Sequence, residues 1–284
     1  MMRIVRSIKL MQEISRKLKI NGKTIGFVPT MGALHEGHLS LIRQARREND
    51  FVVVSIFVNP TQFGPKEDFK KYPRDLKNDA RLCAKEKVDY IFYPDARQMY
   101  PEGHGTSVDC QGLGDVLCGK SRPGHFKGVA TVVIKLFNIV SPDKAYFGQK
   151  DAQQALIIKK AAQDLNLPVK IKVLATVRAK DGLALSSRNS NLDQSERLDA
   201  RVIPQALSLA RKLIKKRNYD TKAIIREMRK MILAKKTARI DYISIVDLDS
   251  LQPLAKIKEN SLIALGIWIG KTRLIDNIIM RKYA

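Results

Sequence analysis

The chain has 284 residues, 44% of them hydrophobic, which suffices for one large domain or two ordinary ones with a substantial core. No apolar stretch approaches the length that spans a bilayer, so we expect no membrane partner. Its cysteines, Cys83, Cys110 and Cys118, fall at irregular spacing, which favours free thiols in a reducing compartment and predicts a cytoplasmic protein.

The net charge is +24, from 52 basic and 28 acidic residues, and such a balance suggests polyanionic partners. The densest basic clusters, Arg211–Arg217 and Arg226–Lys236, lie on helical patterns whose other face is apolar. No aromatic residues alternate with them to stack bases. They are therefore typical of solvated helix faces, and we expect no nucleic-acid partner, although an RNA-binding module remains the second hypothesis.

Strand and helix patterns alternate over the first part of the chain. Met1–Ile20 mixes basic and apolar residues and predicts an amphipathic helix. The strands are expected at Ile25–Val28, Phe51–Val58, Val88–Tyr93, Lys144–Phe147 and Val169–Val173, and the helices at His38–Glu48, Asp75–Glu86, Gly128–Val140 and Asp151–Asn166. This order predicts an α/β fold, a Rossmann-like doubly wound parallel sheet over residues 1–176.

The pattern changes after Thr176. Two helices are expected at Ser195–Arg217 and Thr221–Lys235, followed by strands at Ile240–Val246, Leu262–Trp268 and Arg273–Asn277. Helices followed by antiparallel strands indicate a smaller α+β C-terminal domain, residues 177–284.

The stretch Pro29–Ser40 carries two histidines where the first strand turns into a helix. Unpaired backbone N–H groups and the positive end of the helix dipole gather at such a junction and suit a polyphosphate. His35 and His38 can each donate to phosphate oxygens, and Gly37 allows a close approach. Two alternatives are that the histidines only cap the helix, or that they form half of a metal site. Since no further ligand pair follows at a metal-binding spacing, we expect no protein metal site.

Other polar segments follow predicted strands or the domain junction. Val58–Pro65 carries Asn59 and Gln62, and Gly148–Gln154 carries Lys150, a point charge within reach of a phosphate. Val177–Asn189 ends in two serines and an arginine that form a cradle for phosphate oxygens. Alone, Val58–Pro65 is more typical of an ordinary polar turn, and the other two segments are equally compatible with one. Ser121–Gly128 is a basic surface turn or a cleft wall. Together, with no activated nucleophile and no Walker motif, they predict chemistry on a nucleotide by positioning and charge stabilisation.

These motifs resemble one family over nearly the whole chain. Pro29–His38 resembles the His-x-Gly-His signature of nucleotidylyl transferases and class I aminoacyl-tRNA synthetases. The motifs Phe57–Phe63, Tyr72–Arg74, Ser121–Phe126, Phe147–Asp151, Asp181–Asn189 and Arg273–Asn277 narrow it to the pantothenate synthetase (pantoate–β-alanine ligase) family.

The resemblance implies a carbon–nitrogen ligase that joins (R)-pantoate and β-alanine to give pantothenate. ATP would be a substrate and Mg²⁺ would bridge its phosphates. Pantoyl adenylate would form with release of pyrophosphate, and AMP would leave when β-alanine attacks. The family is usually dimeric, so a homodimer is expected.

The resemblance also implies residue roles. His38, as proton donor, and His35, Lys150 and Arg188 would be catalytic, and Gln62 and Gln154 would bind pantoate, with Gln62 also at β-alanine. The ATP site would comprise Met31, Gly32, Ala33, Leu34, His35, Glu36, Gly37, His38, Gly148, Gln149, Lys150, Asp151, Val177, Leu185, Ser186, Ser187 and Arg188, with the C-terminal domain closing over it.

Two features depart from the family pattern. Gln149 stands where many members carry Glu, and the +24 charge is unusual. Another nucleotidylyl transferase on the same scaffold is the nearest rival, and it would lack the pair Gln62 and Gln154.

Overall fold

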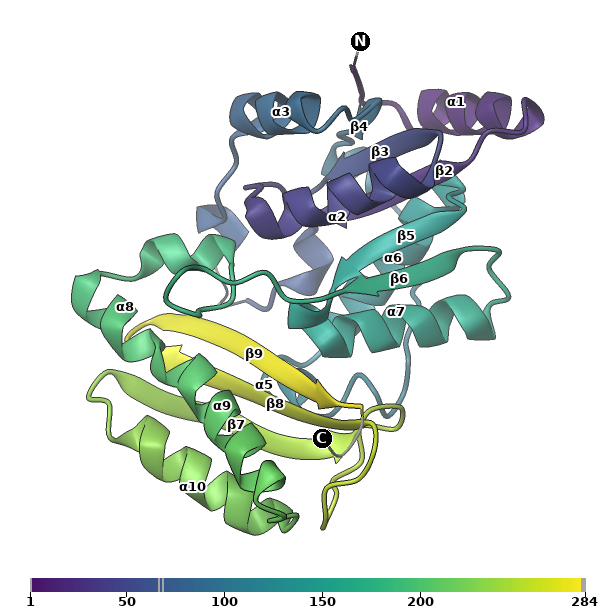
Figure 1. The fold of residues 1–284 in the computed structure, drawn as a ribbon. Helices are drawn as coiled ribbons and strands as arrows, with labels where there is room; N and C mark the ends of the chain where they lie inside the picture. The colour runs from purple at the N-terminus through teal and green to yellow at the C-terminus, as the bar shows by residue number, and fades with distance from the viewer. Residues whose placement is uncertain (1, 66, 68, 282–284) are drawn as a thin grey trace. The chain divides into compact units, whose positions relative to one another are not determined.

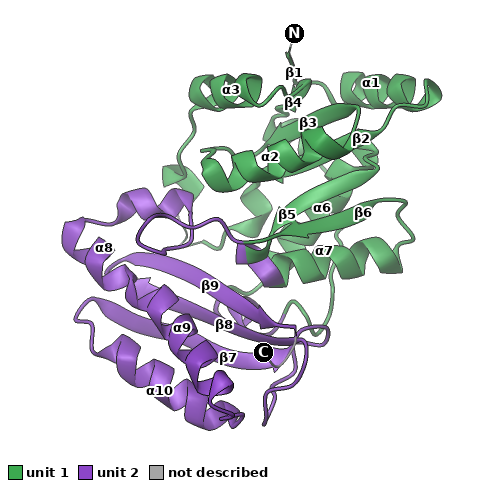
Figure 2. Ribbon diagram, in the orientation of Figure 1, with its two compact units in different colours: residues 1–114, 122–149, 153–175 green, residues 115–121, 150–152, 176–284 purple. Residues whose placement is uncertain are grey.

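The computed structural model describes residues 2–65, 67 and 69–281. By their internal contacts these form two compact units (Figure 2). The first comprises the described residues of 1–114, 122–149 and 153–175, and the second comprises those of 115–121, 150–152 and 176–284. The second unit thus includes two short segments from the middle of the chain.

The first unit is built on a six-stranded sheet in which every pair of neighbours is parallel (Figure 1). In spatial order the strands are β1 (Arg3–Val5), β4 (Tyr90–Phe92), β3 (Phe51–Ile56), β2 (Ile25–Thr30), β5 (Lys144–Gly148) and β6 (Lys170–Leu174). The apolar, β-branched residues of β3 suit a strand that is covered on both faces.

Successive residues of β2 and β3 enter two different apolar clusters, because side chains of a strand alternate between the faces of the sheet. Phe27 and Val53 belong to the cluster under α1 (Ile8–Ile20), α6 (His125–Val140) and α7 (Ala152–Asp164). Val28 and Val54 belong to the cluster under α2 (Glu36–Glu48) and α3 (Leu76–Lys85). Helices therefore cover both faces, and the predicted doubly wound sheet is confirmed.

The chain order reverses between β2 and β5. From β2 the chain proceeds to β3 and β4 on one side, and it then returns to the other side of β2 to form β5 and β6. Parallel sheets bind ligands at the carboxyl ends of the strands beside such a switch point. The segments after β2 and β5 are two of the three that the sequence marks as phosphate-binding; the third is Val177–Asn189.

The second unit contains a three-stranded antiparallel sheet and helices that bury its apolar side chains. The strands follow the order β7 (Ala238–Asp247), β8 (Ser261–Ile269) and β9 (Thr272–Met280), and the helices are α8 (Gln194–Ala200), α9 (Val202–Lys215) and α10 (Thr221–Leu233). Its core joins α9 and α10 to β8 and β9. The predicted α+β class is confirmed, whereas the functional boundary at residues 176 and 177 stays a prediction.

The remaining short elements connect these layers. They are α4 (Ala96–Met99), α5 (Cys118–Ser121) and the 3-10 turns η1 (Pro60–Gln62), η2 (Phe69–Lys71), η3 (Gln149–Asp151) and η4 (Ser187–Asn191). Within the described residues, no helix is long and apolar enough to cross a bilayer.

Two expected helices differ from the observed ones. The N-terminal segment begins with strand β1, which pairs with β4, so the helix covers only its second part. The helix expected over Ser195–Arg217 is divided into α8 and α9 at Arg201. Pro204 explains the break, since proline has no N–H to continue α8 and is tolerated in the first turn of a new helix.

Gly128 sets the approach of α6 to η1. A Cβ at this position would lie 2.3 Å from the Thr61 carbonyl oxygen. We predict that Gly128→Ala lowers the free energy of unfolding by about 1–3 kcal/mol, because the backbone of η1 must move away. Gly105→Ala is the control, since its Cβ would meet only the Gly103 oxygen at 4.0 Å. Urea unfolding of both variants measures the effect, and equal stability of the two would contradict the packing argument.

Candidate functional site

The turn between β2 and α2 is held by a buried carboxylate. Asp79, 1% exposed on α3, accepts hydrogen bonds from the N–H groups of Ala33 (2.9 Å) and Leu34 (2.7 Å). Gly32 and Ala33 both have positive φ, 86° and 51°, and the N–H of Gly32 bonds to the Thr30 hydroxyl oxygen at 3.1 Å. Burial raises the pKa of Asp79, and the two N–H donors oppose that shift. The turn therefore has a fixed path to the start of α2.

His35 and His38 form a reciprocal cap at the N-terminus of α2. Nδ1 of His35 accepts from the N–H of Gly37 (3.1 Å), and Nδ1 of His38 accepts from the N–H of His35 (3.3 Å). A ring nitrogen that accepts a hydrogen bond carries no proton in neutral imidazole, so the proton of each ring is on Nε2. The ring centroids are 4.1 Å apart. Capping and phosphate binding, which the sequence left as alternatives, are thus compatible.

Gln62 lies in η1, after β3, and its side-chain amide has a defined orientation. Gln62 is 8% exposed, its Oε1 accepts from Nδ2 of Asn59 (3.2 Å), and its Nε2 lies 2.9 Å from Sδ of Met31. Asn59, 1% exposed, is in turn held by the Tyr100 hydroxyl at 2.7 Å and by the Gly128 carbonyl at 3.1 Å. The structure thus brings together Met31 and Gln62, which the sequence assigned to ATP and pantoate.

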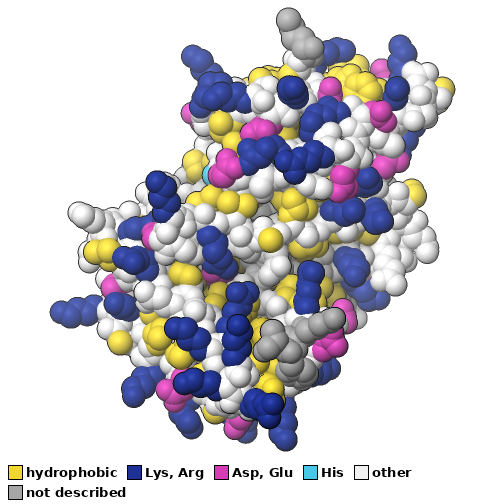
Figure 3. Space-filling model, viewed as in Figure 1, with side chains coloured by type: hydrophobic (Ala, Val, Ile, Leu, Met, Phe, Trp, Pro, Cys, Tyr) yellow, Lys and Arg dark blue, Asp and Glu magenta, His cyan; other side chains and the backbone are white. Residues whose placement is uncertain are grey.

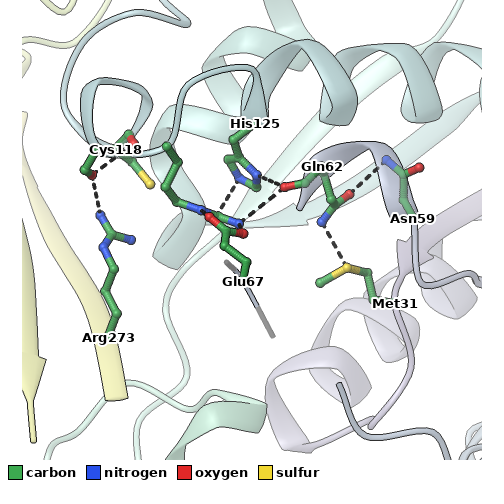
Figure 4. A network of polar contacts seen from close by, with 9 residues as sticks. Met31, Asn59, Gln62, Glu67, Cys118, His125 and Arg273 are labelled. Carbon is green, nitrogen blue, oxygen red and sulfur yellow. Dashed lines mark hydrogen bonds and ion pairs between the residues drawn. The ribbon is translucent and has the colours of Figure 1, made fainter. Parts of the chain in front are cut away.

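The backbone of Gln62 is anchored from the start of α6 (Figure 4). Nδ1 of His125 lies 2.8 Å from the Gln62 carbonyl oxygen, and Nε2 lies 2.9 Å from the Arg122 guanidinium. A carbonyl only accepts and a guanidinium only donates, so the His125 proton is on Nδ1. Arg122 is also bidentate to Glu67, with Nε to Oε1 at 2.8 Å and Nη2 to Oε2 at 2.5 Å.

Glu67 and Arg122 are coupled electrostatically. Burial alone would raise the pKa of Glu67, but the hydrogen bond and the charge of Arg122 outweigh it and lower that pKa. The side chains are 26% and 14% exposed, so the pair is only partly screened by water. A charged Glu67 therefore holds Arg122 beside His125 and Gln62.

Lys150 lies in η3, directly after β5. Its side chain is 20% exposed, with Nζ 3.4 Å from Oδ1 of Asp151, and its carbonyl oxygen accepts from Nδ2 of Asn277 at 3.0 Å. Gly148 ends β5, and Gln149 begins the 3-10 turn. Gln154 is partly buried in the first turn of α7, and its approach to Gln62 stays a prediction.

Residues 177–188 form a small hairpin in the second unit. The N–H of Leu185 bonds to the Val177 carbonyl (3.0 Å), and Arg178 pairs with Ala184 in an antiparallel bridge. Ser186 then caps η4 by accepting from the N–H of Arg188 at 3.3 Å. Ser186, Ser187 and Arg188 are therefore consecutive at one end of the hairpin, and each is partly exposed.

Sequence reasoning missed several residues that hold these groups. In the sequence, Asp79 looks like an ordinary polar residue of an amphipathic helix, and Glu67 looks like part of a charged loop. Their roles are not visible there because their hydrogen-bond partners are far away in the chain. Arg122 and His125 could have been suspected, since they lie in the polar segment Ser121–Gly128 that the sequence singled out without a role.

Within the described residues, no group of three or more His, Cys, Asp or Glu side chains could hold a metal ion. The segments that follow β2, β3 and β5 instead carry N–H donors, amides and a cation. Such a set recognises anionic oxygens and orients them without supplying a covalent nucleophile.

The Rossmann-like sheet and the histidine-capped helix at its switch point define a nucleotide-binding α/β enzyme. The model of the pantoate–β-alanine ligase family matches residues 3–279, and the chain belongs to that family. Its activity is the ATP-dependent synthesis of pantothenate from pantoate and β-alanine.

Relatives and solved structures agree over the full length. The chain is 54% identical to the pantothenate synthetase of Caldicellulosiruptor bescii over 98% of each chain, and 53% identical to that of Moorella thermoacetica over 98% and 99%. A Thermus thermophilus pantothenate synthetase structure matches with a TM-score of 0.93 and 42% identity, over 99% and 100% of the chains. A Francisella tularensis ligase, described as complexed with β,γ-ATP and β-alanine, matches with a TM-score of 0.81 and 38% identity, over 100% of each chain.

The pair Glu67 and Arg122 predicts an acid-dependent stability. Because the folded pKa of Glu67 lies below its unfolded value, the stabilisation is complete above the unfolded pKa and is lost as pH falls through the folded one. We expect Glu67→Gln to cost about 1–2 kcal/mol of unfolding free energy at pH 7, and less as the pH falls below about 4.

The control is Glu227→Gln, since Glu227 on α10 is 42% exposed and has only a loose contact with Arg226. Urea unfolding at pH 7 and pH 3.5 measures both variants. A Glu67→Gln deficit that stays the same at the two pH values would contradict the electrostatic origin.

Proposed function

We propose that the ligation proceeds in two steps through pantoyl adenylate. A pantoate carboxylate oxygen attacks the α-phosphorus of ATP, a P–O bond forms, and the bond to pyrophosphate breaks. The β-alanine amine then attacks the activated carbonyl carbon and forms the amide, the bond from that carbon to the bridging oxygen breaks, AMP leaves with that oxygen, and the amine releases a proton to solvent. Each step moves negative charge onto phosphate oxygens, so donors aimed at those oxygens lower the barrier.

The observation that carries this proposal is the cap of α2. His35 and His38 both direct Nδ1 to backbone N–H groups, so the ring protons are held on Nε2. In the proposed mechanism these Nε2–H groups donate hydrogen bonds to the phosphate chain. The proton-donor role that the resemblance implies for His38 is then hydrogen-bond donation to the leaving pyrophosphate, because a neutral imidazole does not give up its remaining proton. The N-terminus of α2 adds its own positive potential.

Cations and hydroxyls complete the proposed ATP site. Lys150 would neutralise charge on the phosphates, and Ser186, Ser187 and Arg188 would bind further phosphate oxygens. Backbone groups of Val177 would meet the adenine. The other proposed contacts are at Met31, Gly32, Ala33, Leu34, Glu36, Gly37, Gly148, Gln149, Asp151 and Leu185.

Gln62 and Gln154 are proposed to hold pantoate. The Gln62 amide supports this, since Asn59 holds its oxygen and its nitrogen points to Met31 Sδ, a weak acceptor. A substrate carboxylate or hydroxyl oxygen is a stronger acceptor and would replace the sulfur. β-Alanine would lie next to the same amide. Closure of residues 177–284 over ATP stays a prediction.

Mg²⁺ is proposed to enter with ATP, bridging its phosphates. The phosphate oxygens are the hard ligands that this ion prefers, and it commonly keeps several waters instead of a full set of protein ligands.

We further propose a cytoplasmic homodimer that does not bind nucleic acid in its function. Cys83, Cys110 and Cys118 form no disulfide within the described residues, which supports a reducing compartment. On the face in Figure 3, Lys and Arg side chains are spread over the surface, with scattered acidic side chains among them. Sedimentation equilibrium tests the dimer. Salt-sensitive RNA affinity without ATP would instead support the RNA-binding alternative.

The first test of the function is pantoate-dependent exchange between ATP and pyrophosphate. We expect exchange with pantoate and Mg-ATP in the absence of β-alanine, because the first step is complete without the amine. EDTA should abolish it, and β-alanine should convert it to net AMP formation. Absence of exchange under conditions that yield pantothenate would rule out a free adenylate step.

The second test separates the two roles of His38. In His38→Asn the side-chain oxygen can replace Nδ1 in the cap, but no donor reaches the Nε2 position, so exchange should fall about 100- to 1,000-fold. His38→Gln places an amide N–H near that position and should retain more activity. The exchange rate of Lys150→Ala should fall by a similar factor, whereas the exchange rate of Lys150→Arg should stay closer to that of the wild type. Thermal unfolding serves as the control, and near-normal exchange in His38→Asn and Lys150→Ala would refute these roles.

A further inference from the structure

Two adjacent polar residues of β9 are buried without belonging to the proposed substrate contacts. Asp276 is 1% exposed and Asn277 is 3% exposed, although their strand neighbours Leu274 and Ile278 belong to the apolar core. Burying a carboxylate and an amide is costly unless each has specific hydrogen-bond partners. Their partners are therefore informative.

Asn277 holds the backbone of Lys150. Its Nδ2 donates to the Lys150 carbonyl oxygen at 3.0 Å, across 127 positions of sequence. Residues 150–152 accordingly group with residues 176–284, and not with the parallel sheet whose strand they follow. Because Lys150 is in a 3-10 turn and not in a regular helix, a fixed carbonyl at this point sets where its long side chain begins.

Asp276 holds the stem of the 177–188 hairpin. Its oxygens accept from both terminal nitrogens of Arg178, at 2.6 and 3.0 Å, across 98 positions. Arg178 also donates to the Gly182 carbonyl at 3.1 Å, which closes the turn. The side chain of Asp276 is fully buried and that of Arg178 is 31% exposed, so this bidentate pair is largely shielded from water.

The two anchors come from one strand of the second unit. We propose that Asp276 and Asn277 are positioning residues for adenylation, through which β9 holds Lys150 and the hairpin that bears Ser186–Arg188 at a fixed separation. This inference rests on the proposed phosphate-binding roles of Lys150 and Arg188. It gives the motif Arg273–Asn277 a function that its local sequence does not suggest.

Loss of such positioning has a measurable effect on the reaction rate. A displacement of about 1 Å of a group aimed at a reacting centre can cost about 100-fold in rate. A residue that merely stabilises the unit would change the melting temperature and leave the exchange rate of the folded protein alone. The two possibilities therefore separate when rate and stability are measured on the same variants.

The experiment uses the full chain and pantoate-dependent ATP–pyrophosphate exchange. Asn277→Ala and Asn277→Leu both remove the donor to Lys150, and leucine preserves most of the volume. We expect each to lower the exchange kcat about 10- to 100-fold, with an unchanged KM for pantoate. Near-ultraviolet circular dichroism confirms that each variant is folded at the assay temperature.

Ser261→Ala is the matched control. Ser261 is also a fully buried polar residue of this sheet, and its hydroxyl bonds only locally, to the backbone of Lys258 at 2.7 and 2.9 Å. The expected result is a lower melting temperature with exchange kcat within twofold, about the limit of assay scatter. Asp276→Asn should raise the KM for ATP and not that for pantoate.

A double-mutant cycle tests whether Asn277 affects the exchange rate through Lys150. If Asn277 acts through Lys150, Asn277→Ala should cost less than about twofold in a Lys150→Ala background, because the group it positions is gone. Equal losses in both backgrounds, or wild-type exchange in both Asn277 variants, would overturn the inference while the role of Lys150 stands. Wild-type exchange in Lys150→Ala itself would overturn that role and the inference together.

Discussion

The site depends on how the backbone N–H groups between β2 and α2 are satisfied. A turn that leaves them buried and unpaired would be unstable, and one that covers the helix N-terminus would exclude a ligand. Asp79 resolves the first problem from α3, since it accepts from Ala33 and Leu34. The two histidines resolve the second, because they cap α2 with Nδ1 and keep their protons on Nε2. In the proposed mechanism, helix capping and phosphate binding thus use different atoms of the same rings.

Hydrogen bonds from supporting residues also fix the other proposed substrate contacts. Gln62 is oriented through Asn59 on one side and through its own carbonyl, held by His125, on the other. Lys150 is tied by its carbonyl to Asn277, and the 177–188 hairpin by Arg178 to a buried carboxylate. Gln62, Lys150 and the hairpin that bears Ser186–Arg188 therefore each have a supporting partner from a distant part of the chain. Such support keeps these groups in place, so that little reorganisation of the protein is needed when charge develops during the reaction.

Much of the fold was predictable because its pattern is local. The apolar runs that predicted β2, β3 and β5 end within two residues of the observed strands, and the helix pattern that predicted α6 ends at the observed Val140. The prediction was wrong at the N-terminus, because Arg3–Val5 becomes a strand only by pairing with β4. It was also wrong over Ser195–Arg217, where amphipathic periodicity outweighed the signal of a proline near the centre. The residue motifs identified the family, since several short motifs had to coincide over the whole chain.

The amino-acid sequence by itself determined the α/β order, the histidine junction and the set of proposed substrate contacts, because these are properties of short segments and their spacing. Which nitrogen of His35 and His38 carries the proton follows from the local cap, whose hydrogen bonds lie within residues 35–38. Only the tertiary structure decided which residues hold Gln62 and Lys150. Those answers depend on hydrogen bonds between residues up to 127 positions apart. Asp79, Glu67 and Asn277 are ordinary polar residues in their local context. Their roles arise from a partner that folding brings within 3 Å, and no local pattern encodes that partner.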